Sequence, residues 1–447
     1  MSKPLWKPNA KQIQKTVVFN FIKQVESDWN VILPNTDALW KFSIQEMEKF
    51  WKSLISFANL KGQTWEGPVI VNSDKLPGAK WFPNARFNIA ENMLRQKDNK
   101  DAIVFWGEDK VKTRLSFNEL YDQVSIMVQV LKKLNIKRGD VICGYIPNMP
   151  HAIIATLAAA SIGAIWSSCS PDFGVQGVLD RFKQVKPKIL FAADGYYYNG
   201  EKYDSLEKIA QISKSLPTIE KIIIINYTTK KPDLSTIPKS TSWNTVMSLY
   251  SKNKIAFEQL PFNQPLYIMF SSGTTGAPKC IIHSAGGALL KHLSEEILHC
   301  NIKPGDRFLF FTTCGWMMWN WLITNLAWGA TLLLYDGSPF FPSPNILFDF
   351  LETENGTIFG TSAKFIDALR KSEIRPITSH KLSRLDRLCS TGSPLAPEGF
   401  DFVYEGIKKD LQLISFTGGT DIIGCFIGGD PTKPVWRGEL QQPIFGM

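Results

Sequence analysis

The chain has 447 residues, which is long enough for a large buried core and for about three domains or subdomains. Its 44% hydrophobic and 20% charged residues are ordinary for a globular protein. The formal charge of +9 is spread among acidic residues without a polybasic run. This pattern argues against a nucleic-acid-binding protein and is compatible with anionic small-molecule substrates.

Cysteine usage and the N-terminus indicate an intracellular protein. The seven cysteines are widely spaced, odd in number and mostly inside apolar runs, which is typical of reduced core residues. The first residues lack the apolar core of a signal peptide. The longest apolar segment, residues 151–166, is too short for a comfortable membrane span and is expected to form a buried helix. We therefore expect a cytosolic protein with no membrane span.

The N-terminal part, residues 1–98, is predicted to be a leading segment with its own helices, and Asp37 to Leu54 has apolar residues at helical spacing. From Ala102 onward short apolar strands alternate with amphipathic helices. Residues 102–106 and 141–146 are predicted strands, and Ser116 with Glu119 forms a capping-box start for the helix between them.

A second series of strands is predicted further along the chain, each followed by a helical stretch. These strands cover residues 266–270, 308–312, 331–335, 385–390 and 411–416. Alternation of this kind favours an α/β fold with mostly parallel sheets and helices on both faces. Residues 232–241, rich in Pro, Ser and Lys, are predicted to be an exposed join between two stacked strand–helix subdomains.

The most informative motif follows the predicted strand 266–270. It is rich in Gly, Ser and Thr and reads Ser271, Ser272, Gly273, Thr274, Thr275, Gly276, Ala277, Pro278, Lys279. Such a loop can turn sharply and direct backbone N–H groups at a polyphosphate. Lys279 adds positive charge, and a helix predicted to begin near Ala285 would add its dipole. The spacing is not that of a Walker-type P-loop. An ordinary Ser/Gly-rich surface turn is the alternative.

Residues 292–299 place His292, Glu296 and His299 on one face of a predicted helix. This is the nearest approach to a metal cluster in the sequence. We interpret it as a solvated helix face rather than a metal site.

Three tryptophans fall within six positions of the segment Thr312–Leu322, directly after a predicted strand. Considered alone, this segment favours a buried aromatic helix. Two further turns follow strands. One is residues 390–395, with Gly392, Ser393 and Pro394; the other is residues 416–421, which end in Gly419, Thr420 and Asp421. The ends of parallel strands are where open α/β sheets bind ligands, although each could be only a structural turn.

Taken together, residues 271–279, 390–395 and 416–421 resemble the motifs of the adenylate-forming enzymes, which include the acyl-CoA synthetases. The resemblance implies that residues 271–276 and Lys279 hold the β- and γ-phosphates of ATP. It implies that Gly392, Ser393 and Pro394 lie along adenine, and that Gly419 and Thr420 contact the α-phosphate. It also implies that Asp421, where the family usually has Glu, helps to hold Mg²⁺. The catalytic residues would be Lys279, Thr420 and Asp421.

Within that superfamily, residues 83–94 are similar to acetyl- and acetoacetyl-CoA synthetases. Residues 315–321, 334–339 and 418–423 are similar to the acetoacetyl-CoA synthetase group in particular. This similarity implies that acetoacetate, ATP and coenzyme A are the substrates, by way of acetoacetyl-AMP, in cytosolic lipid synthesis from ketone-body carbon. Trp316, Trp319 and Gly418 would then line the carboxylate pocket, where bulky indoles keep the pocket short. The oligomeric state is not predicted.

The resemblance also implies elements for which the sequence has no counterpart after residue 441. These are an acid that clasps the ribose, a hinge, and a small C-terminal α+β domain with a catalytic lysine. We expect residues 1–98 to be the N-terminal segment and residues 99–447 to be an AMP-binding domain lacking its C-terminal end. A ligase for another short carboxylic acid and a non-catalytic nucleotide-binding homologue remain the alternatives.

Overall fold

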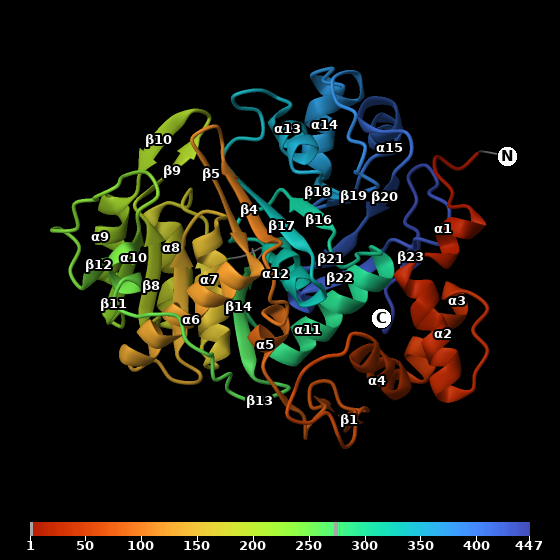
Figure 1. Ribbon diagram of the computed structural model, residues 1–447, viewed down its shortest axis with the longest axis horizontal. Helices are drawn as coiled ribbons and strands as arrows, with labels where there is room; N and C mark the ends of the chain where they lie inside the picture. Colours follow the sequence, from red (N-terminus) through yellow and green to blue (C-terminus); the bar gives the residue numbers. More distant parts are fainter. Residues whose placement is uncertain (1–2, 272–275, 277) are drawn as a thin grey trace.

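The computed structural model describes residues 3–271, 276 and 278–447, and its dominant features are two seven-stranded sheets (Figure 1). The first sheet has the order β12 (Ser240–Ser242), β11 (Lys221–Ile225), β8 (Ile189–Ala193), β6 (Val141–Tyr145), β7 (Ile165–Cys169), β14 (Pro265–Ser271), β15 (Lys279–Ser284). The second sheet has the order β20 (Gln412–Ser415), β19 (Arg387–Thr391), β18 (Ile358–Ser362), β16 (Arg307–Phe310), β17 (Thr331–Asp336), β4 (Asp101–Gly107), β5 (Val111–Ser116). In each sheet the neighbours are parallel except the last pair, β14–β15 in the first and β4–β5 in the second.

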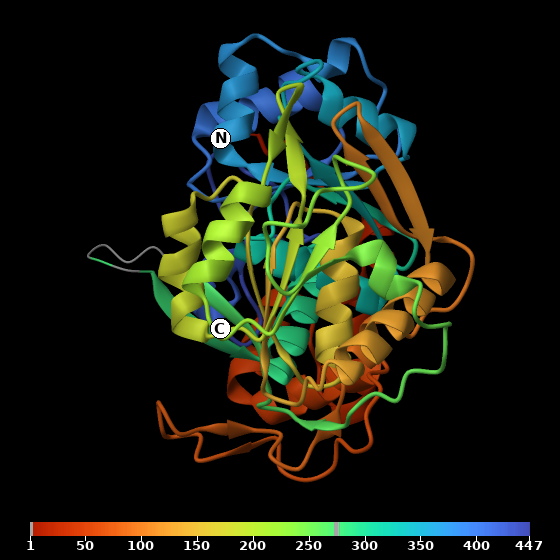
Figure 2. The ribbon, with the colours of Figure 1, turned by 90° about the vertical axis from the view of Figure 1, so that its left-hand side faces the viewer.

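Both sheets are covered on both faces, because their central strands are apolar on both sides. In β11, Ile223 and Ile225 face the central core, whereas Ile222 and Ile224 face an outer cluster. Figure 2 shows helices on each side of the yellow-green strands. Between the sheets lie α6 (Phe117–Lys133), α7 (Pro150–Ser161), α11 (Ala285–Leu293) and α12 (Met317–Thr324). Outside them lie α8 (Val175–Val185), α9 (Leu206–Ser215), α13 (Ile346–Thr353), α14 (Ala363–Lys371) and α15 (Pro397–Phe402).

The predicted α/β fold of two stacked, mostly parallel subdomains is therefore confirmed, and so are the predicted strands. The capping box of α6 is also present: the Ser116 hydroxyl accepts the Glu119 N–H, and the Glu119 carboxylate accepts the Ser116 N–H. The predicted grouping of strands is wrong at two places. Strand β4 belongs with the later strands in the second sheet, and β14 belongs with the earlier ones in the first. Helices α6 and α11 carry the chain from one sheet to the other.

The predicted join at residues 232–241 is also wrong. This stretch connects β11 to β12 within the first sheet, so it does not separate the subdomains. Its Pro- and Ser-rich composition reflects an exposed loop at a sheet edge, where the backbone can be solvated.

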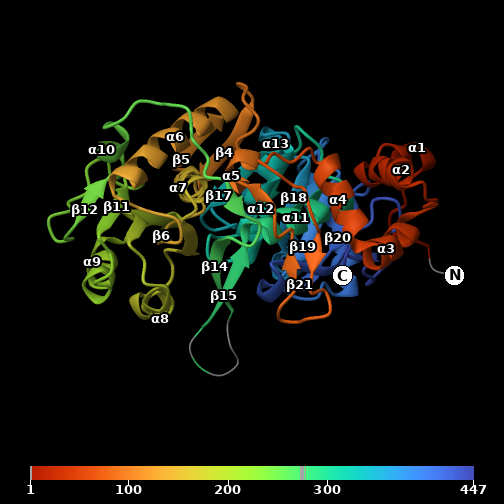
Figure 3. The same ribbon diagram turned by 90° about the horizontal axis from the view of Figure 1, so that it is seen from below.

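The N-terminal segment contains α1 (Ala10–Gln14), α2 (Val17–Trp29), α3 (Thr36–Gln45) and α4 (Met47–Phe57). The helix expected over Asp37–Leu54 is thus two helices that meet at Glu46. Figure 3 shows the four helices at the opposite end of the molecule from β11 and β12. The smaller elements are α5 (Ile89–Met93), α10 (Trp243–Met247), β1 (Ile70–Val71), β2 (Lys80–Trp81), β3 (Arg86–Phe87), β9 (Gly195–Tyr198), β10 (Glu201–Asp204), β13 (Leu260–Pro261), β21 (Thr417–Gly419), β22 (Gly424–Gly428) and β23 (Gln442–Pro443).

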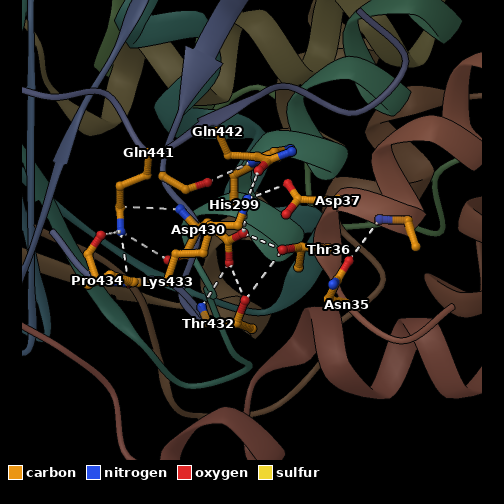
Figure 4. Close-up of polar contacts among 12 residues, drawn as sticks. Asn35, Thr36, Asp37, His299, Asp430, Thr432, Lys433, Pro434, Gln441 and Gln442 are labelled. Atoms are coloured by element: carbon orange, nitrogen blue, oxygen red, sulfur yellow. Dashed lines mark hydrogen bonds and ion pairs between the residues drawn. The ribbon is translucent and has the colours of Figure 1, made fainter.

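Helix α3 is fixed to the last residues of the chain by a polar network, the terminal clasp, shown in Figure 4. The clasp comprises Thr36, Asp37, Asp430, Thr432, Lys433, Gln441 and Gln442. At its centre is the buried Asp430, whose carboxylate accepts the Thr36 hydroxyl at 2.5 Å and the Thr432 N–H at 2.8 Å. The Gln441 amide donates to the Asp430 carbonyl at 3.1 Å. The clasp joins residues almost 400 positions apart.

In the described part of the chain, every helix is too short or too polar to span a lipid bilayer.

Candidate functional site

A cavity of about 510 Å³ opens at the carboxyl ends of β19 and β20, which are neighbours in the second sheet. The start of α12 closes one side of it. The residues that line it are Trp316, Met317, Met318, Thr391, Gly392, Ser393, Pro394, Leu395, Phe400, Ser415, Phe416, Thr417, Gly418, Gly419, Thr420, Gly424, Cys425, Gly438 and Leu440. The two turns singled out in the sequence therefore face one another across a single cavity.

The first wall is the turn after β19. Gly392 has φ of +86°, a left-handed conformation that favours glycine, and the chain then runs through Ser393 and Pro394 to the start of α15 at Pro397. The glycine leaves backbone and small side chains, rather than a bulky group, facing the cavity. A flat ring can approach such a surface closely.

The opposite wall is the turn after β20, which runs through β21 and a short 3₁₀ helix, Thr420–Ile422, into β22. A Cβ at Gly418 would lie 2.1 Å from the carbonyl oxygen of Gly424, so only glycine fits this strand pairing. Asp421 is exposed beside the cavity wall. The turn thus offers Thr420 and an exposed carboxylate next to one another.

His283 on β15 connects the first sheet to this wall. Its Nε2 lies 2.7 Å from the Thr420 carbonyl oxygen, which can only accept, so Nε2 carries the proton. Burial lowers the pKa of His283, although the Thr420 carbonyl and Asp421 oppose that shift. A neutral imidazole therefore holds the Thr420 backbone. Sequence reasoning missed this residue, because it sits inside an ordinary strand.

The three tryptophans of the 312–322 segment have three different environments. Trp316 is 67% exposed and lines the cavity, and its role in a carboxylate pocket stays a prediction. Trp319 is fully buried and donates its indole N–H to the Asn148 side chain at 3.0 Å. Among the described residues it is not part of the lining of this cavity, and its place in the carboxylate pocket stays a prediction. Trp321 is also buried, and α12 turns it toward Glu295.

The reason for this difference is the helix itself. Trp316 precedes α12, whereas Trp319 and Trp321 lie within it and face the core between the sheets. Met317 and Met318 in the same run also line the cavity. The sequence does not predict them as pocket residues, because two methionines among tryptophans do not indicate a binding site.

The predicted phosphate loop joins β14 to β15 in an antiparallel hairpin. Ser272, Gly273, Thr274, Thr275 and Ala277 lie outside the described residues. Of the rest, Gly276 has φ of +114°, and the exposed Lys279 pairs across the hairpin with Ser271. The expected helix does begin at Ala285, but β15 separates it from the loop. The predicted contribution of its dipole to the loop is therefore wrong.

The interpretation of His292, Glu296 and His299 as a solvated helix face is wrong, because all three are buried. Helix α11 continues into a π-helical segment, Ser294–His299, which packs inside the central core. Burial lowers the pKa of His292 and of His299 to about 3. Polar residues on one face of a helix therefore do not predict exposure when the helix lies between two sheets.

Asp421 is the residue for which a metal role is predicted. Among the described residues no group of three or more His, Cys, Asp and Glu side chains converges as a metal site. An exposed carboxylate at a cavity wall fits an ion that takes its other ligands from a bound nucleotide and water, as Mg²⁺ usually does.

Comparison with known proteins identifies the family of the chain. The family described as AMP-binding enzyme matches residues 90–444, and the acetyl-coenzyme A synthetase N-terminus matches residues 36–93. The chain belongs to the AMP-binding enzymes. It is 48% identical to the acetoacetyl-coenzyme A synthetase of Rhizobium meliloti, over 100% of this chain and 68% of that protein. It is 35% identical to the malonamoyl-CoA synthetase vrtB of Penicillium aethiopicum, over 99% of this chain and 65% of that protein.

Among solved structures, the acetoacetyl-CoA synthetase from Streptomyces lividans superimposes with a TM-score of 0.94 at 38% identity, covering 100% of this chain and 69% of that one. The resemblance and the enzyme class inferred from the motifs, an acyl-CoA ligase, are confirmed. The boundary near residue 98 and the roles of the individual site residues stay predictions.

Proposed function

We propose that the chain carries the adenylating site of an ATP-dependent acetoacetate–CoA ligase. The proposed reaction converts acetoacetate, ATP and CoA to acetoacetyl-CoA, AMP and diphosphate through acetoacetyl-AMP. The observation that carries this proposal is the cavity itself. The turns after β19 and β20 line one cavity of about 510 Å³, together with Trp316, Met318, Gly424 and Cys425.

The cavity has two chemical parts. The turn of Gly392, Ser393 and Pro394 presents backbone and small side chains to the cavity, which suits the adenine ring. Gly419 and Thr420 on the opposite wall supply backbone and hydroxyl groups that suit the α-phosphate. Trp316 and Gly418 would bound the space for the acyl group, next to that phosphate.

Adenylation requires two anions, a carboxylate and a triphosphate, to be held at bonding distance. Positioning and electrostatic stabilisation supply most of the acceleration in such reactions. In this chain Lys279, at the base of the hairpin loop 272–278, would bring positive charge to the β- and γ-phosphates. Asp421 would help to hold Mg²⁺, which would neutralise phosphate charge when bound.

Acetoacetate is the proposed acid because the relatives named for it match along the whole chain. A cavity bordered by Trp316 suits a short, polar carboxylate better than a fatty acid. The malonamoyl-CoA synthetase relative supports the same size class, because malonamate is also a short acid with a second carbonyl. A ligase for such an acid is therefore the second candidate.

The test combines nucleotide binding with a survey of acids on the full chain. Calorimetric titration with AMP and with MgATP should show competing binding at one site. ATP–pyrophosphate exchange should then be fastest with acetoacetate among acetate, butyrate, acetoacetate and malonamate. Exchange that is fastest with malonamate would replace the substrate. Nucleotide binding without exchange for any acid would favour a non-catalytic homologue, and absence of nucleotide binding would refute the proposal.

A further inference from the structure

The cavity wall from Thr420 to Cys425 is held from behind by four side chains of the β15–α11 region. His283 binds the Thr420 carbonyl, and His292 Nε2 lies 2.9 Å from the Ile423 carbonyl. Lys291 donates to the Cys425 carbonyl, and Glu295 accepts the Cys425 N–H. The wall is too short to be fixed by its own ladder: its 3₁₀ turn ends at Ile423 with φ of +47°.

Glu295 is the centre of this support. It is fully buried, and its carboxylate accepts from three donors: the Cys425 N–H at 2.8 Å, the Trp321 indole at 2.9 Å and the Lys291 ammonium at 3.2 Å. Lys291 also donates to the Cys425 carbonyl at 2.9 Å. Burial raises the pKa of Glu295, whereas these donors oppose the shift. One carboxylate therefore connects α12, α11 and β22.

The contact with β22 is direct. A Cβ on Gly424 would lie 2.4 Å from Glu295 Oε1 and 2.8 Å from Lys291 Cε. Glycine at this position, with a φ that any residue could adopt, leaves room for the two charged side chains, and a larger residue would displace them. Glu295 and Lys291 thus contact Gly424 and Cys425, the same two residues that line the cavity.

A buried ion pair of this kind adds little net stability, because desolvation of two charges offsets their attraction. An apolar pair of similar volume would fill the same space. What apolar side chains could not do is satisfy the N–H and the carbonyl of Cys425 at once. The ion pair therefore fixes the position of the wall more than it stabilises the fold.

We propose that Glu295 and Lys291 are positioning residues, which hold the wall Thr420–Cys425 in the geometry that the nucleotide site needs. This inference rests on the proposed function for its link to nucleotide. The link to wall geometry stands on the contacts alone. The two parts can be measured separately.

The test uses the double variant Lys291→Met/Glu295→Leu, which keeps the volume and removes both charges. Hydrogen–deuterium exchange of a peptide covering residues 416–428 should rise about ten-fold in the unliganded chain, because both Cys425 groups lose their side-chain partners. AMP affinity should fall by about ten-fold. Glu295→Gln keeps one acceptor oxygen, which can serve the Cys425 N–H but not also the Trp321 indole on the other oxygen, so both values should lie between those of the double variant and of wild type.

The matched control is the neighbouring Glu296→Gln. Glu296 is equally buried in the same π-helical segment, but neither of its oxygens has a hydrogen-bond partner among the described residues. Its variant should leave exchange at residues 416–428 and AMP affinity unchanged.

Unchanged exchange in the double variant would overturn the inference, as would equal effects of Glu296→Gln. If the double variant does not fold, Gly424→Ala should produce the same local rise, and its absence would also overturn the inference. Failure of the wild-type chain to bind AMP would count against the proposed function, while the exchange data would still decide the positioning role.

Discussion

The cavity rim and the terminal clasp both bring together residues from distant parts of the chain, yet they are built in opposite ways. The cavity rim comprises Trp316, Gly392, Thr417, Gly418 and Asp421. In the clasp, the buried Asp430 carboxylate and the Gln441 amide have partners on every side (Figure 4). At the rim, Asp421 and Trp316 are exposed, and Gly392 and Gly418 keep the backbone bare.

The difference separates structural polar groups from groups available to a ligand. A buried polar group without a partner costs roughly 1–3 kcal/mol, so most polar groups that a fold buries for its own sake have partners. Polar groups at a binding site stay open, because the ligand completes them. Substitutions in the clasp should therefore change stability alone, and substitutions at the rim should change binding alone.

The largest effect is expected at Trp319, which is near the rim in sequence but in the core in space. Trp319→Ala removes a fully buried indole and leaves the Asn148 side chain without its donor, so the free energy of unfolding should fall by about 3–5 kcal/mol. Chemical denaturation measures the change. A loss below about 1 kcal/mol would show that the indole is not a core residue.

Lys279→Ala should weaken MgATP binding by roughly 10- to 100-fold, because a charge-assisted contact to phosphate is lost. Lys279 is exposed at the start of β15, so the midpoint of thermal unfolding should not move. Lys214→Ala, at the last turn of α9 and far from the hairpin in the sequence, is the matched control and should leave affinity unchanged. Equal MgATP affinity in the wild-type and Lys279→Ala chains would contradict the assigned role.

In the clasp, Thr36→Val should lower the free energy of unfolding by about 1–2 kcal/mol, since a buried carboxylate oxygen loses its hydroxyl donor. AMP affinity should stay the same. Thr417→Val, the same substitution at an exposed position of the rim, is the counterpart and should leave stability unchanged. If Thr36→Val weakened AMP binding, the clasp and the rim would be coupled, and substitutions in the clasp would not change stability alone.

Sequence reasoning predicted the fold class and both turns of the cavity, since each rests on local signals. Apolar runs marked β19 and β20, and Gly, Ser and Thr marked the turns that follow them. It could not assign β4 and β14 to the correct sheets, because a strand's own residues do not specify its neighbours. It also failed for Glu295 and His283, whose functions depend on backbone groups more than 100 residues away.

Trp316 and Trp319 lie in one motif, and the local sequence does not show that the first is exposed and the second buried. Trp316 also gives the smallest expected effect that tests the difference between the rim and the clasp. Trp316→Ala should leave stability nearly unchanged, because the indole is 67% exposed. It should enlarge the acyl space, and each added methylene that becomes buried contributes about 0.8 kcal/mol, or roughly four-fold in relative rate. ATP–pyrophosphate exchange with butyrate, pentanoate and hexanoate should therefore gain relative to acetoacetate. An acid profile identical to that of the wild-type chain would place the acyl group elsewhere in the cavity. The rim would then contact only the nucleotide.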